Sequence, residues 1–286
     1  MKRTLLQNAV HKSPDIRNFW VCLTAMESNQ SNSSALRAFR MLECIAQQSD
    51  GKTMSELMRD TALPKQTVHR ILEQLLLAGL VVKYPGDRRY QLGRRIEDFA
   101  VSALMTSPSQ RERHAILQAL VDDLGETCNI TALAGSDIVY LDRVEAAWPL
   151  RAILTPGSHV PLHATASGKL LLSLLPKPQR ERLLNILPMR PVTGKTHTAR
   201  GALEQELVRT RRERIGINQE EHLQGLIAVA VPVMLTKEKA CAAVAVQAPV
   251  GRKSLEDLLG FVPRMRSAAE GIASTFCGDN ELVDQT

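Results

Sequence analysis

Two short helical patterns, separated by a break that contains a proline, mark the segment 53–79. Thr53 and Glu56 have the spacing of a capping box, in which each side chain satisfies a free backbone N–H group at a helix start. Pro64 suits the first position of the next helix, where its missing N–H group is not needed. Gly79 suits the left-handed position that closes a helix. Two helices joined by so tight a turn predict a helix-turn-helix.

A further helical pattern precedes this segment and a hairpin pattern follows it. Upstream, apolar residues recur at helical spacing at Leu36, Phe39, Leu42 and Ile45. Downstream, strands are predicted over Leu80–Tyr84 and Arg89–Leu92, with a turn at 85–87 between them. The order helix, helix, turn, helix, hairpin over residues 34–93 predicts a winged helix-turn-helix.

The third helix of this unit has one apolar face and one polar face. If its apolar residues are buried, the outward side chains of its first two turns are Lys65, Gln66, Thr67, His69 and Arg70. Glutamine pairs well with adenine and arginine with guanine, and a threonine hydroxyl can bind phosphate. A merely solvated helix face would also be polar. The predicted wing adds basic residues, however, and both surfaces together favour double-stranded DNA as the partner: Lys83, Arg88 and Arg89.

The remaining chain alternates between strand and helix patterns. A linking helix is predicted over 93–107 and an amphipathic helix over 110–124. Strands follow at 129–134, 138–144, 150–154, 226–234 and 240–247, and helices at 166–175, 177–187, 201–214 and 255–276. This pattern predicts an α+β domain on an antiparallel sheet.

We therefore expect five regions along the chain. A flexible N-terminal arm covers 1–33, with Met26 as an alternative start of the protein. A DNA-binding domain covers 34–93, a linking helix 94–108, an α+β domain 109–276, and a C-terminal tail 277–286. The length of 286 residues agrees with two domains.

Composition narrows the class of protein. The five cysteines are odd in number and scattered, without the spacing of a disulfide framework or a metal site, and this favours a reducing cytoplasm. No apolar run is long enough to cross a bilayer, so we expect a cytoplasmic protein without a membrane partner. The net charge of +6 fits an anionic partner but decides little by itself. No cofactor or metal is expected.

The segment 164–170, Ala-Thr-Ala-Ser-Gly-Lys-Leu, places small residues and a glycine at a predicted helix start. Free N–H groups and the helix dipole favour an anion there. A Walker-type phosphate loop does not fit, because His163 replaces its first glycine and Leu170 its metal-binding hydroxyl. A carboxylate ligand is the better interpretation, and ordinary helix capping is the alternative.

Both halves of the chain resemble one known family. The segment "SELMRDTALPKQTVHRILEQLLLAGLV" with "RRYQLG" resembles the DNA-binding domain of IclR-type regulators, and "LRAILTPGSHVPLHATASGKLLL" with "RRERIGINQEEHLQGLIAVAVPV" resembles their effector domain. The resemblance covers about 34–275. It implies that 109–276 is a GAF-like effector-binding and oligomerisation domain and that the chain forms a homodimer or dimer of dimers. It also implies a transcriptional regulator of a catabolic operon, with RNA polymerase as a further partner.

The resemblance also implies a small-molecule carboxylate effector between the glycine-containing loop and the sheet. Matching motif to motif gives the effector-binding positions Ala166, Ser167, Gly168, Asn218, Ala228, Ala245 and Gln247. Because the two sheet alanines offer room without polarity, we expect an aromatic carboxylate. A small aliphatic keto acid is the alternative.

Several polar residues remain as weaker candidates. Arg151 could clamp the carboxylate in a bidentate way, although an ion-paired surface arginine is the commoner case. His163 and His222 could donate to the acid, but structural roles are favoured, and Glu220 and Glu221 lack a further ligand for a metal.

An enzyme is disfavoured by the lack of any nucleophile signature around three residues that could serve: Ser167, Cys128 and Cys241. A DNA-binding protein without a ligand is disfavoured because the region 109–276 is larger than pairing two subunits requires.

Overall fold

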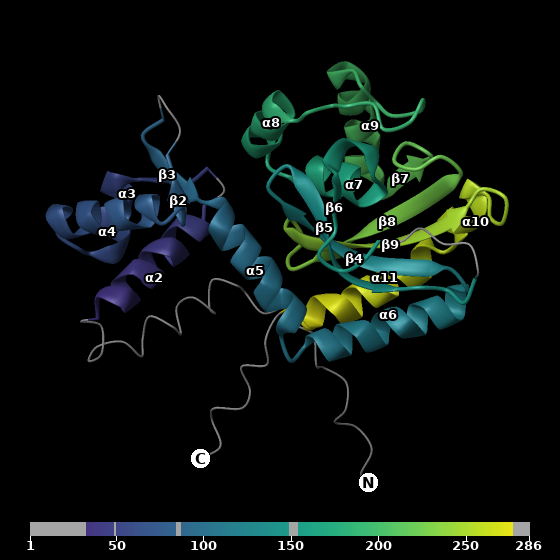
Figure 1. Cartoon of the computed structure of the whole chain (residues 1–286), viewed down its shortest axis with the longest axis horizontal. Coiled ribbons are helices and arrows are strands. Elements are labelled where there is room, and N and C mark those ends of the chain that lie inside the picture. The colour runs from purple at the N-terminus through teal and green to yellow at the C-terminus, as the bar shows by residue number, and fades with distance from the viewer. Residues whose placement is uncertain (1–32, 49, 84–86, 149–153, 277–286) are drawn as a thin grey trace, which may run out of the picture.

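The structure, a computed structural model, describes residues 33–48, 50–83, 87–148 and 154–276. Over these residues the chain forms two parts, and helix α5 (Arg94–Thr106) connects them (Figure 1). The N-terminal part combines helices with a small sheet, and the C-terminal part is a six-stranded antiparallel sheet with helices on both faces. The predicted fold class, a winged helix-turn-helix followed by an α+β domain, is confirmed.

The N-terminal part contains helices α2 (Ser34–Ala46), α3 (Met54–Thr61) and α4 (Lys65–Leu77). Its strands β1 (Lys52–Thr53), β2 (Val81–Val82) and β3 (Arg89–Leu92) form an antiparallel sheet in the order β1-β3-β2. Strand β1 was not predicted, because two residues show no alternation and form a strand only through their pairing with β3. Strand β2 is shorter than predicted, and residues 84–86 of the wing lie outside the described residues.

Local chemistry sets the ends of α3 and α4. Thr53 Oγ1 accepts from the N–H group of Glu56 at 3.3 Å, and Glu56 Oε2 accepts from the N–H group of Thr53 at 2.7 Å, which confirms the capping box. Gly79 has a φ of 68°, which lets the N–H group of Leu80 reach back to the last turn of α4. Pro64 is the N-cap of α4, one position earlier than predicted.

The core of the N-terminal part lies between its helices and sheet, and its buried members are Met41, Cys44, Ile45, Leu57, Val68, Ile71, Leu72, Leu75, Val81 and Tyr90. The predicted apolar stripe of the first helix is only partly buried. Leu36 and Phe39 are 53% and 58% exposed, because α2 turns Met41 and Cys44 toward α3 instead. Periodicity located this helix but did not fix which edge of its apolar face meets the core.

The C-terminal sheet has the strand order β6-β5-β4-β9-β8-β7. Its strands are β4 (Thr127–Ala134), β5 (Asp137–Val144), β6 (His159–Pro161), β7 (Gly216–Gln219), β8 (Leu226–Met234) and β9 (Ala240–Pro249). The short edge strands β6 and β7 were not predicted. The predicted strand 150–154 lies almost entirely outside the described residues, and its last residue is not in a strand.

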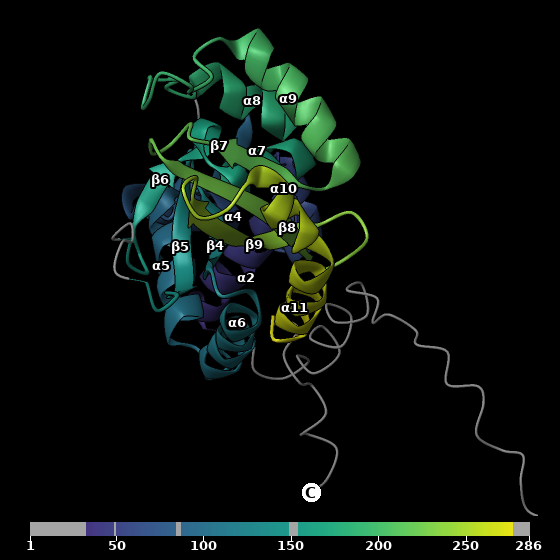
Figure 2. The same cartoon turned by 90° about the vertical axis from the view of Figure 1, so that its right-hand side faces the viewer.

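Each face of this sheet carries its own helical layer (Figures 1 and 2). The apolar face packs on α6 (Gln110–Leu124), α10 (Leu255–Gly260) and α11 (Val262–Ser274) through a valine-rich core. The predicted closing helix is thus two helices, because Pro263 starts a new one in its first turn.

The opposite face is covered by the turn η1 (Leu162–Ala164) and by α7 (Ala166–Leu174), with α8 (Lys177–Ile186) and α9 (Arg200–Glu213) beyond them. Helix α7 lies so close to β7 that a Cβ atom on Gly216 would stand 2.1 Å from the carbonyl oxygen of Ala166.

An ion pair also connects the two parts. Arg182 Nη2 on α8 lies 2.9 Å from Asp50 Oδ1, which is beside the small sheet of the N-terminal part. None of the described helices is long and apolar enough to span a membrane.

Candidate functional site

Helix α4 presents one polar face to solvent. Val68, Ile71, Leu72 and Leu75 are at most 5% exposed, so the packing fixes the rotation of the helix. Lys65, Gln66, His69 and Arg70 are therefore exposed, and Thr67 is half-buried. His69 Nδ1 lies 3.4 Å from Glu73 Oε2, where both side chains are largely in solvent. The predicted base-reading residues thus share one accessible surface at the start of α4.

The basic residues of the wing have different environments. Lys83 and Arg88 are exposed, and the Lys83 ammonium lies 5.3 Å from the centre of the Tyr90 ring. Arg89 turns back into its own domain, where Nη1 donates to the carbonyl oxygen of Gly51 at 2.9 Å and lies 3.3 Å from Glu56 Oε2. Arg89 therefore ties the wing to the start of α3, a role that its sequence position did not reveal.

Polar side chains gather on the sheet face that α7 covers. Cross-strand pairing places Asn218, Ala228, Gln247 and Thr127 in one row and Gly216, Ala230, Ala245, Asn129 and Arg143 in the next. Partners in a row point to the same side of a sheet. The opposite side of these strands carries the valine core, so the sheet has one apolar face and one polar face at β4 and β9.

Between this polar face and α7 lies a cavity of about 30 Å³. Six of the predicted effector-binding residues line it: Ala166, Ser167, Asn218, Ala228, Ala245 and Gln247. Further lining residues include Asn129, Thr131, Tyr140, Thr165 and His222.

Gly168 and Arg151 stand apart from these residues. Gly168 is not in the lining, and its own place is explained by packing, because a Cβ atom there would lie 2.1 Å from the carbonyl oxygen of Leu162. Arg151 lies outside the described residues.

Several polar groups at this cavity have no partner within the part of the chain that the structure describes. The amide of Asn129, which is 2% exposed, makes no hydrogen bond there, and neither does the hydroxyl of Ser167, which is 4% exposed. Asn218 Oδ1 accepts from the N–H group of Glu221 at 2.9 Å, so the amide nitrogen of Asn218 remains for a ligand. Buried polar groups are usually hydrogen-bonded, so these groups make the cavity a candidate site for a polar ligand.

The ionisable groups at the cavity are shifted toward their neutral forms. Burial lowers the pKa of His222, and the nearby His163 lowers it further. Burial raises the pKa of the Tyr140 hydroxyl. His163 itself is not in the lining, because its Nε2 pairs with the carbonyl oxygen of Arg190 at 2.9 Å. At neutral pH the cavity thus offers neutral hydrogen-bonding groups.

Positive charge lies directly behind Gln247. In the amide orientation that pairs with Arg143, Gln247 Oε1 accepts from both terminal guanidinium nitrogens, at 2.9 and 2.8 Å. The Arg143 side chain is 2% exposed. A second cavity, of about 160 Å³, begins here and shares Gln247 and Leu226 with the first.

Sequence reasoning missed Asn129, Thr131, Tyr140 and Arg143. A signal existed for the first two, since polar residues at 129 and 131 alternate with Cys128, Ile130 and Ala132 in a buried strand.

The comparisons with known proteins agree with both parts of this description. Residues 34–85 match the IclR helix-turn-helix domain, and residues 103–274 match the bacterial transcriptional regulator IclR C-terminal family. The chain belongs to the IclR family of bacterial transcriptional regulators. The predicted family is confirmed, and the matched families and relatives are regulators rather than enzymes.

Individual relatives cover most of this IclR-family chain. SauR of Cupriavidus necator, a probable transcriptional regulator, is 52% identical over 250 residues, which is 87% of this chain and 99% of SauR. The transcriptional repressor IclR of Escherichia coli is 26% identical over 86% of this chain and 90% of its own length.

Solved structures give the same result. A transcriptional regulator from Rhodococcus sp. RHA1 is 28% identical, with a TM-score of 0.58, and the match covers 85% of this chain and 98% of that one. An IclR homologue from Microbacterium hydrocarbonoxydans, complexed with 4-hydroxybenzoate, matches at 24% identity with a TM-score of 0.54, over 86% of this chain and 99% of that one.

Within the described residues, no group of three or more His, Cys, Asp and Glu side chains is placed to hold a metal ion.

Proposed function

We propose that this chain binds operator DNA through α4 and the wing, and that a small organic acid bound under α7 changes its affinity for that DNA. The observation that carries the proposal is the set of unpartnered polar groups at Asn129, Ser167 and Asn218, all at least nine-tenths buried around one cavity. A cavity with such groups is suited to a ligand with several hydrogen-bonding atoms.

A compact hydroxy or keto acid fits this cavity better than the aromatic carboxylate predicted from Ala228 and Ala245. The cavity volume of about 30 Å³ is small, so an acid of two or three carbons needs less widening of the cavity than an acid with an aromatic ring. The lining also offers several hydrogen-bonding side chains that the two alanines alone did not suggest. The hydroxybenzoate complex belongs to a relative at 24% identity, which supports the fold rather than this ligand.

The acid's carboxylate belongs at the start of α7 in this proposal. The side chain of Thr165 caps the helix by accepting from the N–H group of Gly168 at 3.1 Å. The remaining N–H groups of the first turn and the helix dipole attract an anion. Polar groups on the sheet face would then bind the hydroxyl or keto oxygen of the same molecule.

We further propose that the DNA-binding form is a homodimer or a dimer of dimers. Large apolar side chains stay exposed on α2 and α5, where Leu36 and Phe39 are joined by Phe99 at 68% exposure. Exposed apolar patches of this kind mark association surfaces. A dimer would place two recognition helices on a pseudo-palindromic operator of a catabolic operon, where contact with RNA polymerase would complete the regulation.

A thermal-shift panel of glycolate, glyoxylate, pyruvate, lactate, benzoate and 4-hydroxybenzoate tests the effector class. A ligand that binds only the folded chain stabilises it by about 2.7 kcal/mol at a hundred times its dissociation constant. We expect one of the four compact acids to raise the melting temperature. A shift with the two aromatic acids alone would contradict the proposed class.

A further inference from the structure

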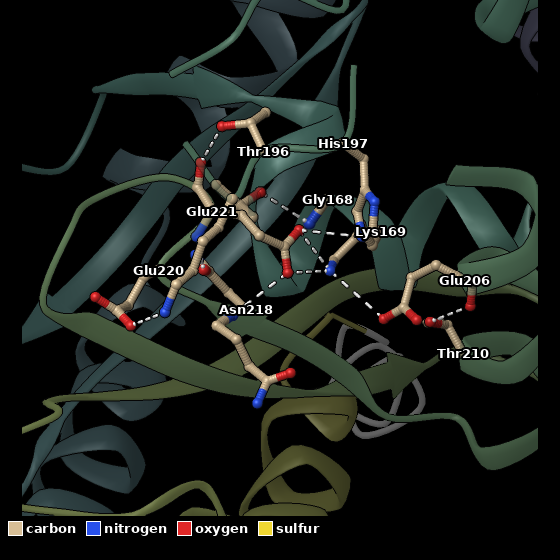
Figure 3. A network of polar contacts seen from close by, with 12 residues as sticks. Gly168, Lys169, Thr196, His197, Glu206, Thr210, Asn218, Glu220 and Glu221 are labelled. Atoms are coloured by element: carbon tan, nitrogen blue, oxygen red, sulfur yellow. Dashed lines mark hydrogen bonds and ion pairs between the residues drawn. The ribbon is translucent and has the colours of Figure 1, made fainter. Parts of the chain in front are cut away.

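Lys169 carries a charge in the interior of the effector domain. Its side chain is 1% exposed, and its ammonium lies 2.6 and 2.7 Å from the two carboxylate oxygens of Glu221. Glu206 Oε1 lies 3.5 Å from the same nitrogen (Figure 3). Burying a lysine is unfavourable unless it is paired and hydrogen-bonded, so this arrangement needs an explanation beyond stability.

The Lys169–Glu221 pair joins two elements that line the cavity. Lys169 follows Ser167 by two residues on α7, and Glu221 lies between Asn218 and His222 on the connection from β7 to β8. Because Ser167, Asn218 and His222 all line the cavity, the pair fixes the distance between its two walls.

Glu221 also organises the backbone of its own loop. Its Oε1 accepts from the N–H group of Gln219 at 3.3 Å, and its own N–H group donates to Asn218 Oδ1 at 2.9 Å (Figure 3). The second bond orients the amide of Asn218, whose nitrogen is then left for a ligand. The charge of Lys169 therefore acts on Asn218 through a chain of two direct contacts.

Neighbouring segments hold the network from outside. Thr196 Oγ1 donates to the carbonyl oxygen of Glu221 at 2.6 Å, and His197 Nε2 lies 3.8 Å from its carboxylate. Burial alone would raise the pKa of Glu206, but the hydrogen bond from Arg209 and the charge of Lys169 outweigh burial and hold that pKa below its usual value. A carboxylate on α9 thus stays ionised and gives Lys169 a second negative partner.

We infer that Lys169 is a positioning residue for the effector cavity, one that holds Asn218 and His222 at a fixed distance from Ser167. This inference rests on the proposed function, since it assigns Lys169 to the effector site. Buried ion pairs are often replaceable by apolar residues without loss of stability, so orientation rather than stability is what the pair adds here.

The test uses the full chain with Lys169→Met and with the double substitution Lys169→Met and Glu221→Met. The single variant leaves a buried carboxylate without its main partner and lowers the melting temperature. The double variant removes both charges and leaves no unpaired buried charge, so it can be measured even if the single variant does not fold. Lys52→Met is the matched control, because Lys52 forms a partly buried pair with Asp60 at 2.5 Å in the N-terminal part.

The first readout is amide hydrogen exchange of the chain without any ligand. We expect exchange at the N–H groups of Gln219 and Glu221 to rise at least tenfold in the double variant and to stay unchanged in Lys52→Met. Unchanged protection at these two amides in the double variant would overturn the inference. This readout needs no effector, so its failure is separate from a failure of the proposed function.

The second readout is calorimetric titration with glyoxylate, pyruvate, lactate and glycolate. We expect the double variant to bind the acid that the wild type binds at least tenfold more weakly, while its melting temperature stays within a few degrees. Equal affinity in wild type and double variant would show that Lys169 is only a core residue. If none of the acids binds the wild type, the proposed effector class fails and the exchange readout decides on Lys169.

Discussion

Asn129→Leu tests whether the amide of Asn129 serves effector binding rather than the stability of the fold. In the chain without ligand this amide is 2% exposed and has no hydrogen bond among the described residues. Replacing it by an apolar group of similar size removes a group that is poorly satisfied in the folded state. We expect the free energy of unfolding to stay level or to rise by up to about 1 kcal/mol.

The same substitution weakens effector binding. A hydrogen bond between neutral groups contributes about 0.5–1.5 kcal/mol, and 1.4 kcal/mol corresponds to a tenfold change in affinity. If the amide of Asn129 binds the hydroxyl or keto oxygen of the acid, Asn129→Leu raises the dissociation constant about 2- to 10-fold. Calorimetric titration measures the affinity, and urea denaturation measures the stability.

Ile130→Val is the matched control, because Ile130 lies on the same strand and points into the valine core on the opposite face. We expect a loss of about 0.5–1.5 kcal/mol of stability and no change in effector affinity. If Asn129→Leu instead destabilises the fold by more than 1 kcal/mol and leaves the affinity unchanged, the assignment of this amide to the ligand is refuted.

Three further substitutions test other parts of the molecule. Arg70→Ala should weaken operator binding by about 1–3 kcal/mol in a gel-shift titration, because the side chain is exposed on α4 and free to reach a base, while the melting temperature stays unchanged. Arg182→Glu should place a negative charge opposite Asp50 and alter the effect of the acid on operator affinity, and adding Asp50→Arg should restore that effect. Because the pair is half-exposed, the free energy of unfolding should change by less than about 1 kcal/mol. Burial lowers the pKa of His222 below its usual 6.5, so the unfolded chain binds more protons than the folded chain near that pH. The free energy of unfolding should therefore fall as the pH drops below 6.5. Urea denaturation at several pH values should show a weaker pH dependence for His222→Gln.

The sequence predicted those features that depend on local chemistry. The Thr53–Glu56 capping box and the left-handed Gly79 act within a few residues, so their spacing is enough to place α3 and the end of α4. Pro263 carried an equally local signal, and the predicted helix 255–276 should have been divided there. Strand β1 could not be predicted, because two residues become a strand only when β3 lies beside them.

The effector cavity was only partly predictable, because it depends on which face of the sheet α7 covers. The loop at 166–168 and the positions Asn218, Ala228, Ala245 and Gln247 followed from the family resemblance. Cross-strand pairing between β4, β5 and β9 brings Asn129 to the cavity and Arg143 behind Gln247, and residue patterns in one strand do not specify such pairing.

Lys169 shows the same limit of sequence reasoning. It stood in a segment that resembled a phosphate loop, but its charge is taken up by Glu221, a partner 52 residues away.

The central claim is that an acid bound under α7 changes the affinity of this chain for operator DNA. The most direct test is fluorescence anisotropy of a labelled fragment from the chain's own promoter region, titrated with wild-type protein and with Asn129→Leu, with and without the acid found in the thermal-shift panel. We predict that the acid changes the operator affinity of the wild type by at least about fivefold, the lower end of usual couplings between sites. The same sub-saturating acid concentration should change the operator affinity of Asn129→Leu less than that of the wild type. Operator affinity that is independent of the acid in the wild type, or equally dependent on it in both proteins, would contradict the account.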